Sequence, residues 1–102
     1  MSHPIDIITS KLSRGELLCQ LAEEGTEMSQ ASLKLRRAED GSNPTPKSKE
    51  ACYDALLEEI ADVSVCLIAL GYDVSLSRMR VSVKMQEKLE RWAKRLEGRE
   101  DA

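Results

Sequence analysis

The chain has 102 residues, 41% of them apolar and 32% charged, a composition that suits one globular domain with a modest core. The absence of Phe and an aromatic content of 3% argue against a β-sandwich, and a net charge of −3 gives no general attraction to nucleic acid or to anionic membranes. There is no apolar run long enough for a membrane span or a signal peptide, and the odd number of cysteines without CxxC spacing indicates reduced thiols, so we expect a cytoplasmic protein.

Residues 1–12 form an N-terminal arm whose structure the sequence leaves open. Pro4 and a short apolar patch fit either a docking arm or a first helical turn. His3 is the single histidine of the chain and lies near its end. A Ser-His-Asp triad and the Glu-x-x-His pattern of di-iron bundles are therefore unsupported.

A long amphipathic helix is predicted from Ser13 to about Ala38. Ser13 and Glu16 fit the capping-box pattern that starts a helix. Glu24 points in the same direction as the apolar side chains of this helix, and Glu27 lies one turn further on at the edge of that direction. The apolar stripe consists of Leu17, Leu21, Met28 and Leu35.

A second helix is predicted after a loop at residues 39–48, with Thr45 or Ser48 as its N-cap. It should run to about Leu70 and stop at Gly71. The stretch LEEIADVSVCLIAL is apolar nearly all round, and such a helix is normally buried. It nevertheless contains Glu59 and Asp62, and an ionised carboxylate is costly to bury unless it is paired or binds a metal.

A third helix is predicted from a cap at Asp73 or Ser75 to about Leu96, followed by a frayed tail at residues 98–102. Cationic side chains follow one another along a flank of this helix, either as a solvated surface with ion pairs or as a phosphate-binding stripe. The flank consists of Lys84, Lys88, Arg91 and Arg95. The stripe predicted to be buried consists of Val81, Met85, Leu89, Trp92 and Leu96.

Two carboxylate pairs combine into one predicted site. Glu24 and Glu27 are three residues apart, as are Glu59 and Asp62, and residues at this spacing are neighbours on a helix surface. If the two helices pack antiparallel through their apolar faces, the four acids converge and repel one another. Hard divalent cations relieve such repulsion, and Mg²⁺ prefers oxygen ligands and commonly shares its shell with phosphates. The pattern predicts a Mg²⁺ site, with Mn²⁺ as a substitute.

These residues resemble the E-x-x-E…E-x-x-D signature of the MazG-like all-α nucleoside triphosphate pyrophosphohydrolases. The flanking segments LLCQLAEE, SQASLKLRRA and LLEEIADVSVCLIAL resemble the small phage- and prophage-type members, so the resemblance extends from about Leu17 to Leu96. It implies metal-dependent hydrolysis of a nucleoside or deoxynucleoside triphosphate between its α- and β-phosphates. The implied Mg²⁺ ligands are Glu24, Glu27, Glu59 and Asp62.

The remaining roles follow from position on the predicted helices. Glu24 or Glu27 is the candidate general base, and Lys84, Lys88 or Arg91 would neutralise charge on the pyrophosphate leaving group. Aromatic side chains that could stack on a nucleobase, or equally pack in the core, are Trp92 and Tyr53.

The expected fold is a single all-α domain over residues 1–102, an antiparallel bundle of about three main helices. Three helices leave an almost wholly apolar central helix partly uncovered, so we expect a homo-oligomer that completes a four-helix unit. The resemblance implies a dimer or a tetramer. The competing hypothesis is a non-catalytic helical module whose apolar stripes bind a partner protein.

Overall fold

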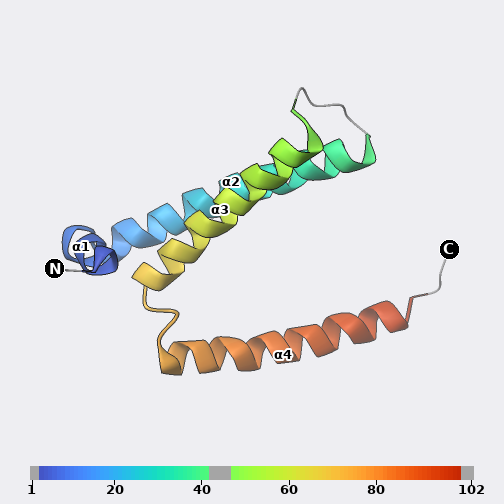
Figure 1. The fold of residues 1–102 in the computed structure, drawn as a ribbon. Coiled ribbons are helices and arrows are strands. Elements are labelled where there is room, and N and C mark those ends of the chain that lie inside the picture. The colour runs from blue at the N-terminus through green and yellow to red at the C-terminus, as the bar shows by residue number, and fades with distance from the viewer. Residues whose placement is uncertain (1–2, 42–46, 100–102) are drawn as a thin grey trace. The chain divides into compact units, whose positions relative to one another are not determined.

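The computed structural model describes residues 3–41 and 47–99, and the regular structure in these ranges is entirely α-helical (Figure 1). The all-α prediction is therefore confirmed for the described chain. None of the helices in these ranges is both long and apolar enough to cross a membrane. The helices are α1 (Pro4–Lys11), α2 (Arg14–Asp40), α3 (Lys49–Ala69) and α4 (Ser75–Glu97).

The chain divides after Leu70 into two compact units. The first contains α1, α2 and α3, and the second contains α4. A single domain over residues 1–102 stays a prediction, and the two units are described separately below.

Both ends of α2 have identifiable capping interactions. The Oγ of Ser13 accepts a hydrogen bond from the backbone N–H of Glu16 at 3.1 Å, which confirms the predicted start. At the other end Gly41 adopts φ 68°, and its N–H donates to the carbonyl of Arg37 at 2.9 Å. The helix extends beyond the predicted end at Ala38. A left-handed residue ends a helix, and the first residue suited to that conformation is Gly41. The rest of the predicted loop, at 42–46, lies outside the described residues.

The limits of α3 agree with the sequence prediction. Ser48 is its N-cap, and the Ser48 Oγ accepts from the N–H of Ala51 at 3.1 Å. The helix ends at Ala69, with Leu70 as its C-cap and Gly71 at φ 85°. Glycine adopts this left-handed conformation without the steric cost that a Cβ atom brings, which explains why the helix stops here.

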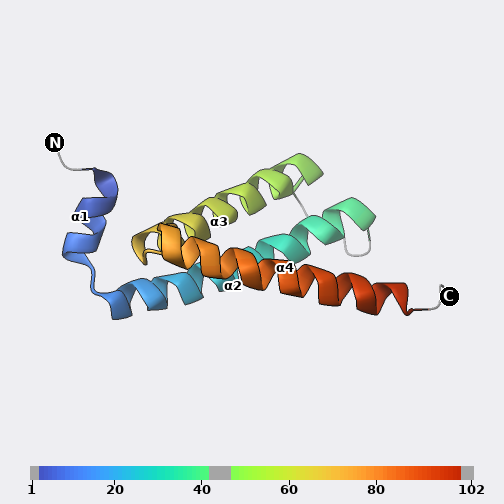
Figure 2. The same cartoon turned by 90° about the horizontal axis from the view of Figure 1, so that it is seen from below.

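Helices α2 and α3 form an antiparallel hairpin and lie side by side in both views (Figures 1 and 2). The residues buried in this unit are mostly small, and α1 also packs against α3. Because the distance between packed helices depends on the side chains at the contact, small side chains allow close approach. The long carboxylate side chains of facing residues can therefore meet. The buried residues are Leu17, Ala31, Cys52, Cys66 and Leu70.

Within the first unit part of the apolar surface of α3 is uncovered, as expected for a helix that needs further partners. Four of its apolar residues are between 42% and 47% exposed. The reason is that α2 and α1 pack against only part of the surface of α3. These exposed residues are Leu57, Ile60, Val65 and Ile68.

The described part of the N-terminal arm is mostly helical, because α1 spans Pro4–Lys11. Pro4 occupies the first turn of α1, where its missing N–H costs nothing. The Nδ1 of His3 accepts a hydrogen bond from the N–H of Ile5 at 3.1 Å, so this histidine caps α1. His3 therefore has a local structural role in the described chain.

One expectation for α4 is corrected. The helix follows Val74, whose side chain makes no capping hydrogen bond, so neither Asp73 nor Ser75 is its N-cap. Within the second unit, described by itself, the stripe expected to be buried is 45% to 60% exposed, and its burial stays a prediction. The exposed stripe consists of Val81, Met85, Leu89, Trp92 and Leu96.

Candidate metal centre

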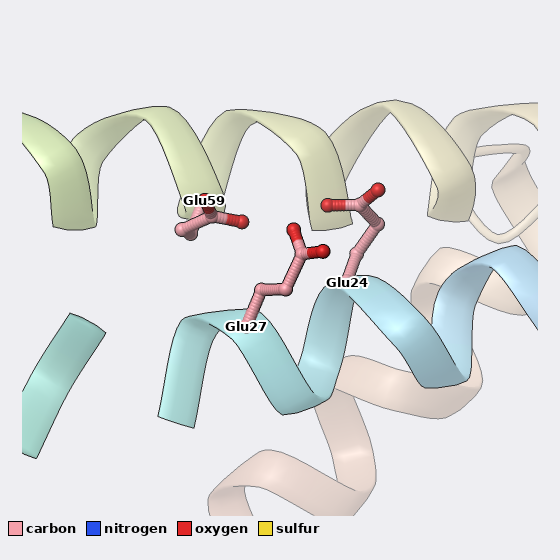
Figure 3. A group of neighbouring side chains, drawn as sticks. All are labelled: Glu24, Glu27 and Glu59. Carbon is pink, nitrogen blue, oxygen red and sulfur yellow. The ribbon is translucent and has the colours of Figure 1, made fainter. Parts of the chain in front are cut away.

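Three of the four predicted carboxylates meet between α2 and α3. Glu24 and Glu27 come from α2, and Glu59 comes from α3 (Figure 3). One carboxylate oxygen from each lies within 4.8 Å of the others. Oxygen ligands of one Mg²⁺ ion, each at about 2.1 Å from the metal, span distances of this order. The hairpin therefore brings together a set of oxygens that can bind one hard cation.

Asp62 belongs to the same electrostatic group, although it is not one of the three closest carboxylates. It lies one turn after Glu59 on α3, and its side chain is exposed. Its negative charge contributes to raising the pKa of both Glu59 and Glu24. The sequence predicts that the four acids converge. In the described chain Glu24, Glu27 and Glu59 form the closest group, and Asp62 lies near enough to influence Glu24 and Glu59 electrostatically.

Neighbouring negative charges contribute to a raised pKa at two of these acids, Glu24 and Glu59. A hydrogen bond from Gln20 to Glu24 Oε1, 2.7 Å long, lowers the pKa of Glu24, but desolvation and the charges of Glu27 and Asp62 raise it above its ordinary value overall. Desolvation is also the main cause that raises the pKa of Glu59, followed by the charges of the same two neighbours. A nearby cation would reverse these effects by favouring the ionised carboxylates.

Two carboxylate oxygens at this site have no protein partner. Glu24 Oε2 and Glu59 Oε2 are buried and accept no hydrogen bond within the described chain. A buried acceptor without a partner loses its hydration and gains nothing in return. A divalent cation would supply the missing interaction for both atoms, so the residues present fit Mg²⁺ or Mn²⁺.

Cys66 borders the site, and the sequence prediction missed it. This thiol is buried, and its pKa is raised by burial and by the charges of Glu24 and Asp62. It therefore stays protonated and acts as a small apolar neighbour of the acids. The sequence could have indicated that Cys66 borders the site, because it follows Asp62 by four residues and lies on the same face of the helix.

The predicted substrate-binding residues lie on α4, in the second unit. Lys88, Arg91 and Trp92 line one surface hollow of this helix, and Lys84 is exposed one turn before Lys88. Tyr53, the other aromatic candidate, is exposed on α3 in the first unit. Four of these five residues therefore lie on one helix, and three of the four line one hollow.

Comparison with protein-family models, with curated proteins and with solved structures found no match. The MazG-like assignment therefore stays a prediction that rests on the motifs and their spacing.

The raised pKa values give a prediction for pH. Because the folded state binds protons at Glu24 and Glu59 more tightly than the unfolded state does, acidification stabilises the fold through these groups. Without metal, a Glu24→Gln/Glu59→Gln variant should melt above the wild type at pH 7. The difference should shrink as the pH falls towards the ordinary Glu pKa of about 4.3. Circular-dichroism melting in EDTA measures it, and a difference independent of pH would contradict the account.

Proposed function

We propose that the protein is a Mg²⁺-dependent nucleoside triphosphate pyrophosphohydrolase of the MazG-like type. It would convert a nucleoside or deoxynucleoside triphosphate to the monophosphate and pyrophosphate. The observation that carries the proposal is the group formed by Glu24, Glu27 and Glu59, with carboxylate oxygens within 4.8 Å of one another. The buried, unpartnered oxygens of Glu24 and Glu59 give this group a need for a cation.

The four carboxylates have two proposed roles at this centre, metal binding and general-base catalysis. Glu24, Glu27, Glu59 and Asp62 would hold Mg²⁺, with Mn²⁺ as a substitute. The bound cation would neutralise charge on the α-phosphate and acidify a water for attack. Glu24 or Glu27 would orient that water and accept its proton as the general base.

The second unit contributes the proposed contacts to the rest of the substrate. Lys84, Lys88 and Arg91 would neutralise charge on the departing pyrophosphate, and Trp92 would stack on the base. The exposed apolar faces of α3 and α4 support assembly into a homodimer or homotetramer that completes a four-helix unit. Burial of these faces in an oligomer would remove apolar surface from water.

Product analysis tests the reaction. The full-length protein is incubated with Mg²⁺ and a panel of canonical and damaged ribonucleoside and deoxyribonucleoside triphosphates, and the products are separated by anion-exchange chromatography. The proposal predicts equal amounts of monophosphate and pyrophosphate. Diphosphate with inorganic phosphate would indicate cleavage at the γ-phosphate and contradict it.

A second function has one observation in its favour. The apolar stripe of α4, with Trp92 60% exposed, suits a helical module that binds a partner protein without catalysis. A non-catalytic interaction module would not explain why the carboxylates are clustered. Thermal melting with and without Mg²⁺ or Mn²⁺ separates the two, because only a metal-binding native state gains stability from the ion. An unchanged melting temperature together with no turnover would favour the interaction module.

A further inference from the structure

A hollow of about 330 Å³ opens in the α2–α3 hairpin directly beside the carboxylates. Glu27 and Glu59 line it, so it is continuous with the candidate metal centre. Lys34, Lys47 and Gln30 also line it and bring cationic and amide groups to the same space. The hollow therefore has both an acidic and a basic part, and the site as described so far uses only the acidic part.

The basic part of the hollow is separated from the carboxylates along the helix axis. Lys34 follows Glu27 by seven residues on α2, so it lies two turns further on along the same face, or about 10 Å of helix. Cys52, which lines the hollow from α3, precedes Glu59 by the same interval. Lys47 comes just before Ser48, the N-cap of α3, where the helix dipole adds positive potential.

We propose that this hollow holds the phosphate tail of the substrate, meaning the β- and γ-phosphates, and therefore also free pyrophosphate. The proposal rests on the proposed function, because it requires a cation at the carboxylates. With a cation held by the carboxylates, the roughly 10 Å of helix between Glu27 and Lys34 would leave room for the rest of the tail. Lys34 and Lys47 then neutralise the oxygens that the cation does not reach.

The charge of the hollow favours a phosphate tail over a nucleobase. A base is uncharged and gains little from two ammonium groups, whereas lysine is a common point-charge ligand for phosphate. Lys34 and Lys47 also belong to the same compact unit as the carboxylates. The hairpin can therefore bind the tail with its own residues, wherever α4 lies.

Isothermal titration of the full-length protein tests this inference with three probes. Mn²⁺ alone reports on the carboxylates, Mn²⁺ with pyrophosphate reports on the tail, and Mn²⁺ with a nucleoside monophosphate reports on the other half of the substrate. The variants are Lys34→Gln and Lys47→Gln. The matched control is Lys11→Gln on α1, an exposed lysine that does not line the hollow.

We expect both hollow variants to bind Mn²⁺ and the monophosphate as the wild type does, and pyrophosphate about tenfold more weakly, equivalent to ~1.4 kcal/mol. The Lys11→Gln control should bind all three probes normally. Unchanged pyrophosphate binding in both variants, or a loss confined to the monophosphate, would overturn the inference while leaving the metal centre intact. A wild-type protein that does not bind Mn²⁺ would instead overturn the proposed function, and this inference with it.

Discussion

A Glu59→Gln variant should hydrolyse nucleoside triphosphates at least a hundredfold more slowly than the wild type, since even residues that only support a metal ligand cost about 10–100-fold. The substitution keeps the size of the side chain but removes the charge of a ligand oxygen that lies within 4.8 Å of those of Glu24 and Glu27. Chromatographic assay of monophosphate release under saturating Mg²⁺ measures the loss. Asp62→Asn should lose activity for the same reason.

The matched control is Glu58→Gln on the preceding residue. Glu58 is exposed and is not one of the clustered carboxylates, so its variant should retain wild-type activity. In metal-free buffer Glu59→Gln should not lower the melting temperature, because it relieves repulsion at a site where desolvation and like charges already raise the pKa of Glu59. Equal activity of the two variants, or lost folding in Glu59→Gln alone, would contradict the assigned role.

An Ala31→Leu variant should lose both stability and activity. Ala31 is buried in the α2–α3 hairpin, at the floor of the hollow beside Glu27 and Glu59. Extra methylene groups in a packed interface cost about 1–3 kcal/mol, and for a domain of this size each kcal/mol lowers the melting temperature by roughly 4–8 °C. The added side chain should also push the helices apart and separate the carboxylates of the proposed cation site.

Ala22→Leu is the control for this effect, because Ala22 is exposed on the same helix. It adds the same side chain to α2 without entering the hairpin interface. Its melting temperature and Mg²⁺-dependent activity should stay close to those of the wild type. If Ala31→Leu melted and hydrolysed like this control, close packing of the hairpin would not be what positions the acids.

The local structure of the hairpin could be predicted from the sequence because each boundary depends on a nearby residue. Ser13 starts α2 through its hydrogen bond to the next turn, and Gly71 ends α3 through a positive φ. The exact end of α2 was missed by two residues, since the pattern does not say which of several polar residues leaves the helix. The cap of α4 was missed as well, because Val74 has no side-chain donor or acceptor to mark it.

The carboxylate pairs were also predictable, for a geometric reason. A spacing of three residues fixes two acids on one helix face, and a short connection between two helices makes them antiparallel, so Glu27 and Glu59 face each other. The hollow with Lys34 and Lys47 could not be predicted from residue spacing. It depends on small side chains that face each other along two turns of the hairpin, and the periodicity of a sequence does not show which residues of two helices face each other.

What covers the apolar faces of α3 and α4 could not be predicted, because hydrophobicity shows that a face needs a partner but not where the partner comes from. Leu57 on α3 and Leu89 on α4 remain 45% and 57% exposed in the described chain. An oligomer is our proposal for what covers such residues.

Direct measurement of Mn²⁺ binding tests the central claim, that the hairpin carboxylates form a divalent-cation site. Electron paramagnetic resonance counts the free ion in a titration of the wild type, of Glu24→Gln/Glu59→Gln, and of Glu23→Gln/Glu58→Gln as the matched control. We predict saturable binding by the wild type and the control, and its loss in the first variant. Equal binding by all three proteins, or no binding by any of them, would contradict the account.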